Sequence, residues 1–472
     1  MKNLKLDTKH LKKLEPKFYN ICRATPLENP SIVSINHTLL KEMNLENIDT
    51  TSADFLDFLN GKFIASGSIP HANAYSGHQF GYFVPNLGDG RALNLGLACG
   101  YHLQLKGSGI TKYSRLGDGK AVLRSSIREY LISEAMHALG IETTRALAIT
   151  SSDTNVHRET IESGSMVLRA SPSWVRFGSF EFAYLGEKKA RHVEMLADYV
   201  IDESYPHLKN STNRYEELYF AIVDKTMEMV AKWQSVGFMH GVMNTDNMSI
   251  AGLTIDYGPF AFMESFDKSF VCNTSDYDGR YSFEAQPYIA QWNLNALLNP
   301  FSVIADKNVM QSYLDSFIGR YKLRYFELMR EKLGLKLSFE EDNTLITQLL
   351  KDMQECKVDY TNFFYLLSYS RFDDILIQAP QMKEWILSYK NRLELEKSDE
   401  QDRISKMQKI NPKYVLKNYM LQEAIDKAQK NDFTLVNSLL KIAQNPHAEH
   451  KEFEHYAKVS NPHAIFKCGC SS

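Results

Sequence analysis

The stretch from residue 240 to residue 260 carries polar side chains at spacings that suit metal and phosphate chemistry. His240 is followed seven residues later by Asn247, and Asp256 comes nine residues after that, before a Tyr-Gly pair. Amide and carboxylate oxygens are the ligands that Mg²⁺ prefers, so Asn247 and Asp256 are candidate metal ligands. The segment between them suits a tight hairpin, which would bring both side chains together.

The same stretch lacks a proton acceptor at a position where a similar motif has one. In the H-R-D-x-x-x-x-N loop of protein kinases, the catalytic Asp stands two residues after the His and the metal-binding Asn seven after it. Asn247 matches the second position, and Asp256 with its Tyr-Gly neighbours imitates the D-F-G triplet. Val242 occupies the first position, and its side chain cannot accept a proton. The pattern predicts a metal-dependent phosphate site without the kinase base.

Cations and glycines that suit phosphate lie earlier in the chain. Lys106 ends an alternating strand, as a phosphate-holding lysine does, and Glu129 or Glu134 on the next helix could pair with it. Glu129 also completes a capping box with Ser126, so a purely structural role stays open. Two similar loops flank the lysine, and their glycines would let a ligand approach the backbone. These loops are Leu87-Gly88-Asp89-Gly90-Arg91 and Leu116-Gly117-Asp118-Gly119-Lys120.

Two arginines, Arg169 and Arg176, stand where the strand-rich part of the sequence ends. An arginine fork binds phosphate oxygens through two contacts, so both are candidates for holding a terminal phosphate. Surface salt bridges are the alternative role, and the sequence alone favours that alternative. The histidines show no tight ligand spacing, so no transition-metal site is expected.

The hydrophobic periodicity changes from strands to helices near residue 185. Strands are predicted at residues 102–106, 144–151 and 165–169, and a helix over 126–139. The later segments with helical periodicity include 190–203, 215–236, 310–333, 344–356 and 413–430. We therefore expect an α+β, protein-kinase-like fold of two lobes, with a small strand-rich N-lobe and a large helical C-lobe.

Four segments are expected along the chain. They are an N-terminal extension of short helices and loops (1–60), an N-lobe with nucleotide-binding loops (61–184), a helical C-lobe with the catalytic loop and metal site (185–400), and a C-terminal helical extension with a cysteine-containing tail (401–472). A chain of 472 residues exceeds the size at which one hydrophobic core stops growing, which agrees with several packed units.

Composition excludes some classes of function. With 44% apolar and 24% charged residues the chain is typical of globular proteins, and its net charge of −3 argues against nucleic-acid binding. It has no apolar run long enough to span a membrane, and its charged amino terminus does not resemble a secretory signal. We therefore expect a cytoplasmic protein, without a membrane or nucleic-acid partner, that is monomeric.

Four motifs together resemble the selenoprotein O family, also called the YdiU family. They are YSGHQFG (75–81), LGDGR (87–91), LRSSIRE (123–129) and the stretch 240–256, and the likeness continues to the Cys-x-Cys-Ser-Ser end. The family has a protein-kinase-like fold without the catalytic-loop aspartate. It transfers AMP from ATP to Ser, Thr or Tyr hydroxyls of proteins and releases pyrophosphate. The resemblance therefore implies a Mg²⁺-dependent protein adenylyltransferase, with Mn²⁺ as an alternative metal.

The resemblance also implies how ATP is held. In the family ATP lies reversed in the cleft, so that its α-phosphate faces the acceptor hydroxyl. Lys106, Arg169 and Arg176 would hold the inward phosphates, and Glu129 would be the partner of Lys106. The remaining residues of the pocket would be Gly88, Gly90, Arg91, Asp118 and Gly119.

The catalytic loop supplies the other implied roles. Asn247 and Asp256 match the metal ligands of the family, and Asp256 also belongs to the nucleotide site. Asp246 matches the residue assigned as proton acceptor, six residues after His240. A carboxylate beside a metal ligand could instead only support that ligand, and this alternative stays open.

The chain ends with Cys468-Gly469-Cys470-Ser471-Ser472, where the family carries a selenocysteine or cysteine third from the end. Cys272 lies 16 residues after Asp256, where kinases place the activation segment. We predict a reversible Cys272–Cys470 disulfide that restricts access of protein substrates, so that reduction raises activity. A strained Cys468–Cys470 bridge and two free thiols are the alternatives.

Two other functions stay open from the sequence. Small-molecule phosphotransferases similar to aminoglycoside or choline kinases, and protein phosphotransferases, keep the aspartate that Val242 replaces. A non-catalytic ATP-binding scaffold would not need Lys106, Asn247 and Asp256 together.

Overall fold

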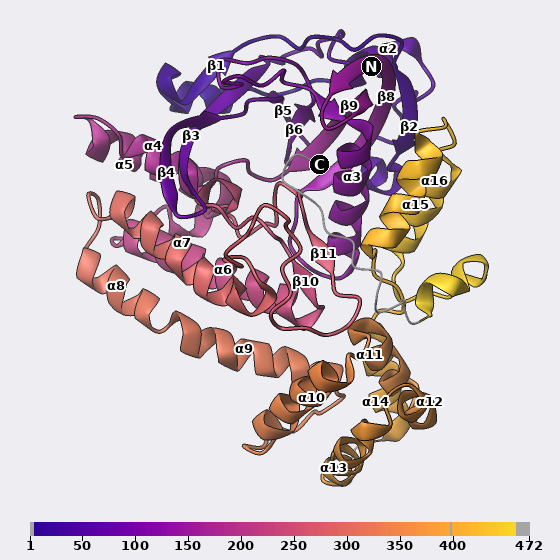
Figure 1. Cartoon of the computed structure of the whole chain (residues 1–472). Helices are drawn as coiled ribbons and strands as arrows, with labels where there is room; N and C mark the ends of the chain where they lie inside the picture. The colour runs from indigo at the N-terminus through magenta and orange to yellow at the C-terminus, as the bar shows by residue number, and fades with distance from the viewer. Residues whose placement is uncertain (1–3, 397–398, 459–472) are drawn as a thin grey trace.

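The computed structural model describes residues 4–396 and 399–458. Strands gather in the N-terminal part of these residues and helices in the C-terminal part (Figure 1). The α+β class and the order of its two parts are therefore confirmed. No helix among the described residues is both long and apolar enough to cross a membrane.

One large antiparallel sheet forms the N-terminal part. Its main path runs β1-β3-β5-β6-β9-β8-β2, with β4 paired to β3 and β7 paired to β9. Its strands are β1 (Tyr19–Ile21), β2 (Ser31–Ile35), β3 (His71–Gln79), β4 (Tyr82–Gly88), β5 (Ala92–Ala98), β6 (Tyr101–Lys106), β7 (Ala121–Val122), β8 (Arg145–His157) and β9 (Ile161–Ser171). The three predicted strands are confirmed as β6, β8 and β9. Lys106 pairs with Ala92 on one side and Val167 on the other, so it ends a central strand.

The first 60 residues contribute strands as well as helices. β1 pairs with β3, and β2 pairs with β8 at the far end of the sheet. Two short helices, α1 (His37–Glu42) and α2 (Ala53–Leu59), follow them. The expectation of helices and loops alone was incomplete. Pro30 directly precedes β2, a position at which proline removes no hydrogen bond of the strand ladder, so it borders the strand and does not break it.

Helix α3 (Leu123–Ala138) packs against β8 and β9 and begins earlier than the sequence predicted. Its N-cap is Val122 and makes no side-chain cap, so the predicted capping box between Ser126 and Glu129 is wrong. Both residues instead lie inside the helix, which directs Glu129 toward the neighbouring strands. Gly140 follows the helix with a φ of 72°, the left-handed conformation that glycine commonly adopts after a helix end.

Helices make up most of the C-terminal part. They are α4 (Phe177–Ala183), α5 (Lys189–Ser204), α6 (Arg214–Ser235), α7 (Gln286–Phe301), α8 (Lys307–Asp315), α9 (Phe317–Lys332), α10 (Asp342–Cys356), α11 (Tyr360–Ser368), α12 (Phe372–Gln378), α13 (Lys383–Glu394), α14 (Glu400–Ile410), α15 (Asn418–Ala428) and α16 (Thr434–Gln444). The single helix predicted for 310–333 is wrong. The chain divides at Ser316, whose hydroxyl bonds to the carbonyl of Tyr313 (2.8 Å).

One buried cluster joins the two parts. It extends from Ile127 in α3 to Trp233 in α6 and Trp385 in α13. The last helices also return to the sheet, and Figure 1 shows α15 and α16 beside α3. Arg128 of α3 bonds to the Asn418 side chain (3.0 Å). The C-terminal helices therefore support the helix that carries Glu129.

Candidate active site

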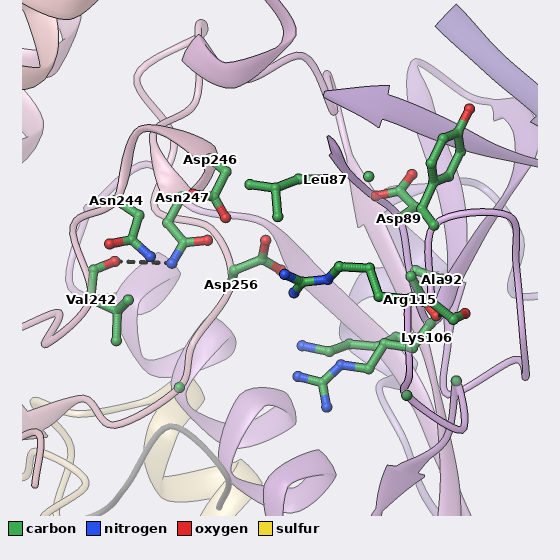
Figure 2. A pocket seen from close by; sticks show the side chains of 18 of the residues that line it. Leu87, Asp89, Ala92, Lys106, Arg115, Val242, Asn244, Asp246, Asn247 and Asp256 are labelled. Carbon is green, nitrogen blue, oxygen red and sulfur yellow. Dashed lines mark hydrogen bonds between the residues drawn. The ribbon is translucent and has the colours of Figure 1, made fainter. Parts of the chain in front are cut away.

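The two parts of the molecule meet at a cavity of about 740 Å³ (Figure 2). Both glycine loops, Lys106 and the loop that contains Asn247 and Asp256 contribute to its wall. Seven Lys and Arg side chains and four Asp side chains line it. The excess of positive charge suits a polyanion such as a triphosphate. The seven cations are Arg91, Lys106, Arg115, Lys120, Arg158, Arg169 and Arg176.

A continuous chain of ion pairs joins five of the predicted residues. Lys106 Nζ lies 2.6 Å from one oxygen of Glu129, and Arg169 lies 2.7 Å from the other. Asp256 is held between Arg169 (2.9 Å) and Arg176 (2.6 Å). The side chains of Arg169 and Arg176 are 3% and 2% exposed, so surface salt bridging, which the sequence alone favoured, is wrong.

The surroundings set the charges of this ion-pair chain. Burial disfavours the charged form of Asp256, but Arg176, Arg169 and Lys106 outweigh it and hold the pKa of Asp256 well below its usual range. Burial also opposes ionisation of Glu129, and Lys106 and Arg169 overcome it and lower the pKa of Glu129. Three cations therefore face two carboxylates, which leaves one positive charge at the cavity wall.

Asp256 reaches the cavity from an unusual backbone conformation. Its φ is 54°, in the left-handed region that side-chain-bearing residues rarely adopt and that clusters at functional sites. The His240 Nε2 nitrogen donates a hydrogen bond to the carbonyl oxygen of Ile255 (2.8 Å), which fixes the residue before Asp256. Met248 and Thr254 pair across the loop, which confirms the predicted hairpin between Asn247 and Asp256.

The catalytic loop, residues 240–247, brings Asp246 and Asn247 to the same side of the cavity as Asp256. Asn247 Nδ2 donates to the carbonyl of Val242 (3.0 Å), which leaves the amide oxygen on the side of Asp256 (Figure 2). Asp246 lies beside them, and one of its oxygens, Oδ1, is buried without a hydrogen-bond partner. Burial raises the pKa of Asp246 to about 6. A carboxylate whose pKa lies near neutral pH suits a proton acceptor.

These oxygens fit Mg²⁺ or Mn²⁺ in chemical type. Asp246, Asn247 and Asp256 offer only hard oxygen ligands. Among residues 4–396 and 399–458, no group of three His, Cys, Asp or Glu side chains is arranged to hold a metal by itself. Mg²⁺ characteristically uses one or two carboxylates together with phosphate oxygens and waters, so this donor set is sufficient only with a nucleotide.

The glycines of both loops line the cavity, but their neighbours are protein atoms. A Cβ on Gly88 would lie 2.3 Å from the Tyr113 ring, and one on Gly90 would lie 2.9 Å from the Tyr113 carbonyl oxygen. Gly119 has a φ of 69°, and a Cβ there would lie 2.1 Å from Gly109. The loop glycines are therefore required for packing of loop on loop, which the sequence did not predict.

Asp118 makes a bidentate ion pair that the sequence did not predict. Its two oxygens accept from Arg158 at 2.9 and 3.0 Å, and this pairing lowers the pKa of Asp118. Arg158 lies on the turn between β8 and β9, some 40 residues from Asp118, so no local spacing could reveal the pair. Arg158 also lines the cavity, and it is a functional candidate that sequence reasoning missed.

Asp89 is a second residue that the sequence interpretation missed. It stands between two glycines, a pattern that is usual for a plain turn. In the structure it is buried, and one oxygen accepts from the backbone of Asn73 and the side chain of Asn94, both at 3.0 Å. Burial raises the pKa of Asp89. The sequence did contain one signal for a buried Asp89, since it is an acidic residue within a strand-rich, apolar segment.

The two predicted redox cysteines do not both fall within the described residues. Cys272 is buried, and its thiol donates to the carbonyl oxygen of Pro259 (2.7 Å), behind the cavity wall. Cys468 and Cys470 lie outside the described residues, so the Cys272–Cys470 disulfide stays a prediction. The other predicted site residues line the cavity, except Glu129, which lies behind Lys106 and is its partner. The alternative partner, Glu134, is wrong, because it pairs with Arg145 (2.8 Å) away from the cavity.

Known proteins that are similar to this chain belong to one family. The family model described as "Protein adenylyltransferase SelO" matches residues 2–444. The chain is similar to proteins named "Protein nucleotidyltransferase YdiU". The protein from Vibrio atlanticus is 44% identical over 455 residues, which cover 94% of this chain and 93% of the relative. Those from Myxococcus xanthus and Aliivibrio salmonicida are 44% and 42% identical, over 92% and 97% of this chain and 91% and 96% of their own lengths. The chain therefore belongs to the SelO family of protein adenylyltransferases and is an enzyme of the nucleotidyltransferase class.

Proposed function

We propose that this enzyme transfers AMP from ATP to Ser, Thr or Tyr hydroxyls of other proteins, on a protein-kinase-like scaffold of two lobes. The lobes would be residues 61–184 and 185–400, with extensions at 1–60 and 401–472. One observation carries the proposal. Three buried cations of the cavity wall are paired with Glu129 and Asp256, while Val242 stands at the position of the kinase base and Asp246 offers a carboxylate nearby.

The burial of these cations supports an orientation of ATP in which the β- and γ-phosphates lie innermost in the cavity. Lys106, Arg169 and Arg176 already pair with carboxylates, so each is positioned before the nucleotide arrives. The β- and γ-phosphates would take over part of these ion pairs, and the α-phosphate would then face the acceptor hydroxyl and Asp246. Arg91, Asp118 and the loop glycines would surround the remainder of the nucleotide.

The transfer itself forms one bond and breaks one. The acceptor oxygen bonds to the α-phosphorus, and the bond from that phosphorus to the bridging oxygen of pyrophosphate breaks. The hydroxyl proton passes to Asp246, whose buried carboxylate has a pKa suited to accept it. The cations neutralise the charge that develops on the departing pyrophosphate. Positioning and charge neutralisation supply most of the catalysis in phosphoryl-type transfer.

Asn247 and Asp256 are the residues that would hold Mg²⁺ or Mn²⁺, with Asp246 adjacent. When bound, the metal would neutralise phosphate charge. Both oxygens of Asp256 are engaged by arginines in this structure. Arginines that turn toward phosphate would release those oxygens, so we expect metal and nucleotide to bind together.

We further propose redox control through Cys272 and Cys470. The Cys272 thiol is packed against the catalytic loop, since a Cβ on Gly241 would lie 2.7 Å from it. A disulfide at Cys272 would therefore displace both Gly241 and Pro259. Because Cys272 is buried, the surrounding segment has to move before such a disulfide forms.

The experiment that tests the proposal incubates the protein with ATP labelled at the α- or the γ-phosphorus, with casein as acceptor. We expect α-label on protein and no γ-label. Protein-bound γ-label alone would instead support a phosphotransferase. Binding of ATP without either label would support a non-catalytic scaffold.

A further inference from the structure

The segment YSGHQFG, residues 75–81, joins the sheet to the catalytic loop. It includes the end of β3 and the turn into β4, and Figure 1 shows this hairpin extending from the sheet to α4. Three consecutive residues of the segment each donate one hydrogen bond to one of three consecutive residues of the loop. The bonds run from His78 N to Thr245 Oγ1 (2.7 Å), from Gln79 Nε2 to Asp246 Oδ2 (3.1 Å) and from Phe80 N to Asn244 Oδ1 (3.1 Å).

Glycines allow an unusually close approach at this joint. A Cβ on Gly77 would lie 2.8 Å from Asp246 Oδ1, and one on Gly178 of α4 would lie 2.0 Å from the carbonyl oxygen of Ser76. A larger side chain at Gly77 would separate β3 from the catalytic loop, and one at Gly178 would separate α4 from β3. The strand, the loop and α4 are therefore packed in contact around Asp246.

Glu181 of α4 connects the three elements. One of its oxygens accepts from the Thr245 hydroxyl (2.5 Å), and the other bonds to His78 Nδ1. The Thr245 hydroxyl thus accepts from the His78 backbone and donates to Glu181 at the same time. Glu181 is buried, and so is Thr245. A closed ring of hydrogen bonds therefore fixes the residue immediately before Asp246.

We propose that Gln79, together with the ring formed by His78, Thr245 and Glu181, positions the Asp246 carboxylate for the acceptor hydroxyl. This inference rests on the proposed role of Asp246. Gln79 fixes the rotation of the carboxylate through Oδ2, and the ring fixes the backbone that carries it. Gln79 lines the cavity, but none of these groups belongs to the ion-pair chain that would hold the phosphates, so their loss should lower turnover with little change in ATP binding.

The first test compares Gln79→Leu with Gln348→Leu, an equal substitution at an exposed position of α10. Rates of α-label transfer to casein are measured over a range of ATP concentrations. We expect Gln79→Leu to lower kcat about 10- to 100-fold, since small misplacements of catalytic groups have effects of that size, with KM for ATP within twofold. The Gln348→Leu protein should match the wild type.

The second test separates the Thr245 hydroxyl from its bulk. Thr245→Val keeps the shape and loses the hydroxyl, and Thr245→Ser keeps the hydroxyl. We expect Thr245→Val to lower kcat as much as Gln79→Leu does. Thr245→Ser keeps the hydroxyl and its hydrogen bonds, so its kcat should stay within about threefold of the wild type. Thermal melting and ATP binding show whether each variant is folded. If Thr245→Val is not folded, the Gln79→Leu variant decides the test alone, because Gln79 is only half-buried.

The inference is overturned if kcat of Gln79→Leu stays within twofold of the wild type, or if its KM for ATP rises while kcat is unchanged. It is likewise overturned if the Thr245 Val and Ser variants are equally impaired. A wild type that transfers no α-label would instead contradict the proposed function, so the two failures are distinguishable.

Discussion

Replacement of Glu129 by Gln tests whether the ion-pair chain is a single charged unit. Each Glu129 oxygen accepts from one cation, at 2.6 Å from Lys106 and 2.7 Å from Arg169. Gln keeps one acceptor oxygen and places an NH₂ group against the other cation. One charge-assisted bond, worth about 1.5 to 3 kcal/mol, is lost, and two buried cations lose their shared counter-charge. Since breaking a buried pair costs about 3 to 5 kcal/mol, we expect a loss of about 3 kcal/mol.

The free energy of unfolding is measured in urea at pH 7, with Glu327→Gln as the matched control. Glu327 pairs with Arg324 on the surface of α9, where its side chain is 50% exposed, so its loss should cost under about 1 kcal/mol. Saturating ATP should reduce the deficit of Glu129→Gln, because phosphates supply negative charge to the same cations. A deficit no larger than that of the control would refute the view that Glu129 balances both cations.

Other perturbations test separate parts of the molecule. Asp246→Asn keeps the shape but cannot accept a proton, so kcat for AMP transfer should fall about 100-fold or more; a fall below tenfold would assign Asp246 a supporting role. Burial lowers the pKa of His71 to about 4, so it stays neutral in the fold while the unfolded chain gains a proton below about pH 6.5. His71 alone should therefore contribute a decline in stability of about 2 to 3 kcal/mol from pH 7 to 4.5 in urea titrations, and His71→Gln should decline less than the wild type by about that amount. Dithiothreitol should activate the oxidised wild type but neither Cys272→Ser nor Cys470→Ser, and equal activity of oxidised and reduced wild type would contradict the redox proposal.

The sequence allowed good prediction where the signal was local. Alternation ending at Lys106 predicted β6, and the spacing from Asn247 to Asp256 predicted a hairpin that the structure confirms. The residues that it missed act across long separations. Gln79 reaches Asp246 over 167 positions, and Arg158 reaches Asp118 over 40, so neither pairing leaves a periodic or spacing signal.

The burial of a charged side chain could not be predicted from neighbouring residues in the sequence either. Arginine is usually exposed, so the sequence favoured a surface position for Arg169. Burial of such a group is tolerated only with paired carboxylates, and these come from Glu129, 40 positions away, and Asp256, 87 positions away. The helix boundary at Ser316 was missed for a different reason, because α8 and α9 share apolar periodicity across a break of a single residue.

The return of α16 to the sheet has a consequence for biosynthesis. Ser34 next to the end of β2 bonds to Asn437 of α16 (2.9 Å), two residues that are 403 positions apart. At about 5 to 20 residues per second, a ribosome needs on the order of 20 to 80 s to make the intervening chain. Throughout that time β2, which ends the sheet, and the face of α3 that α16 covers stay open to other nascent chains. This edge of the sheet is therefore covered only after α16 has been made, and a ribosome that stalls before α16 releases a chain with an uncovered sheet edge.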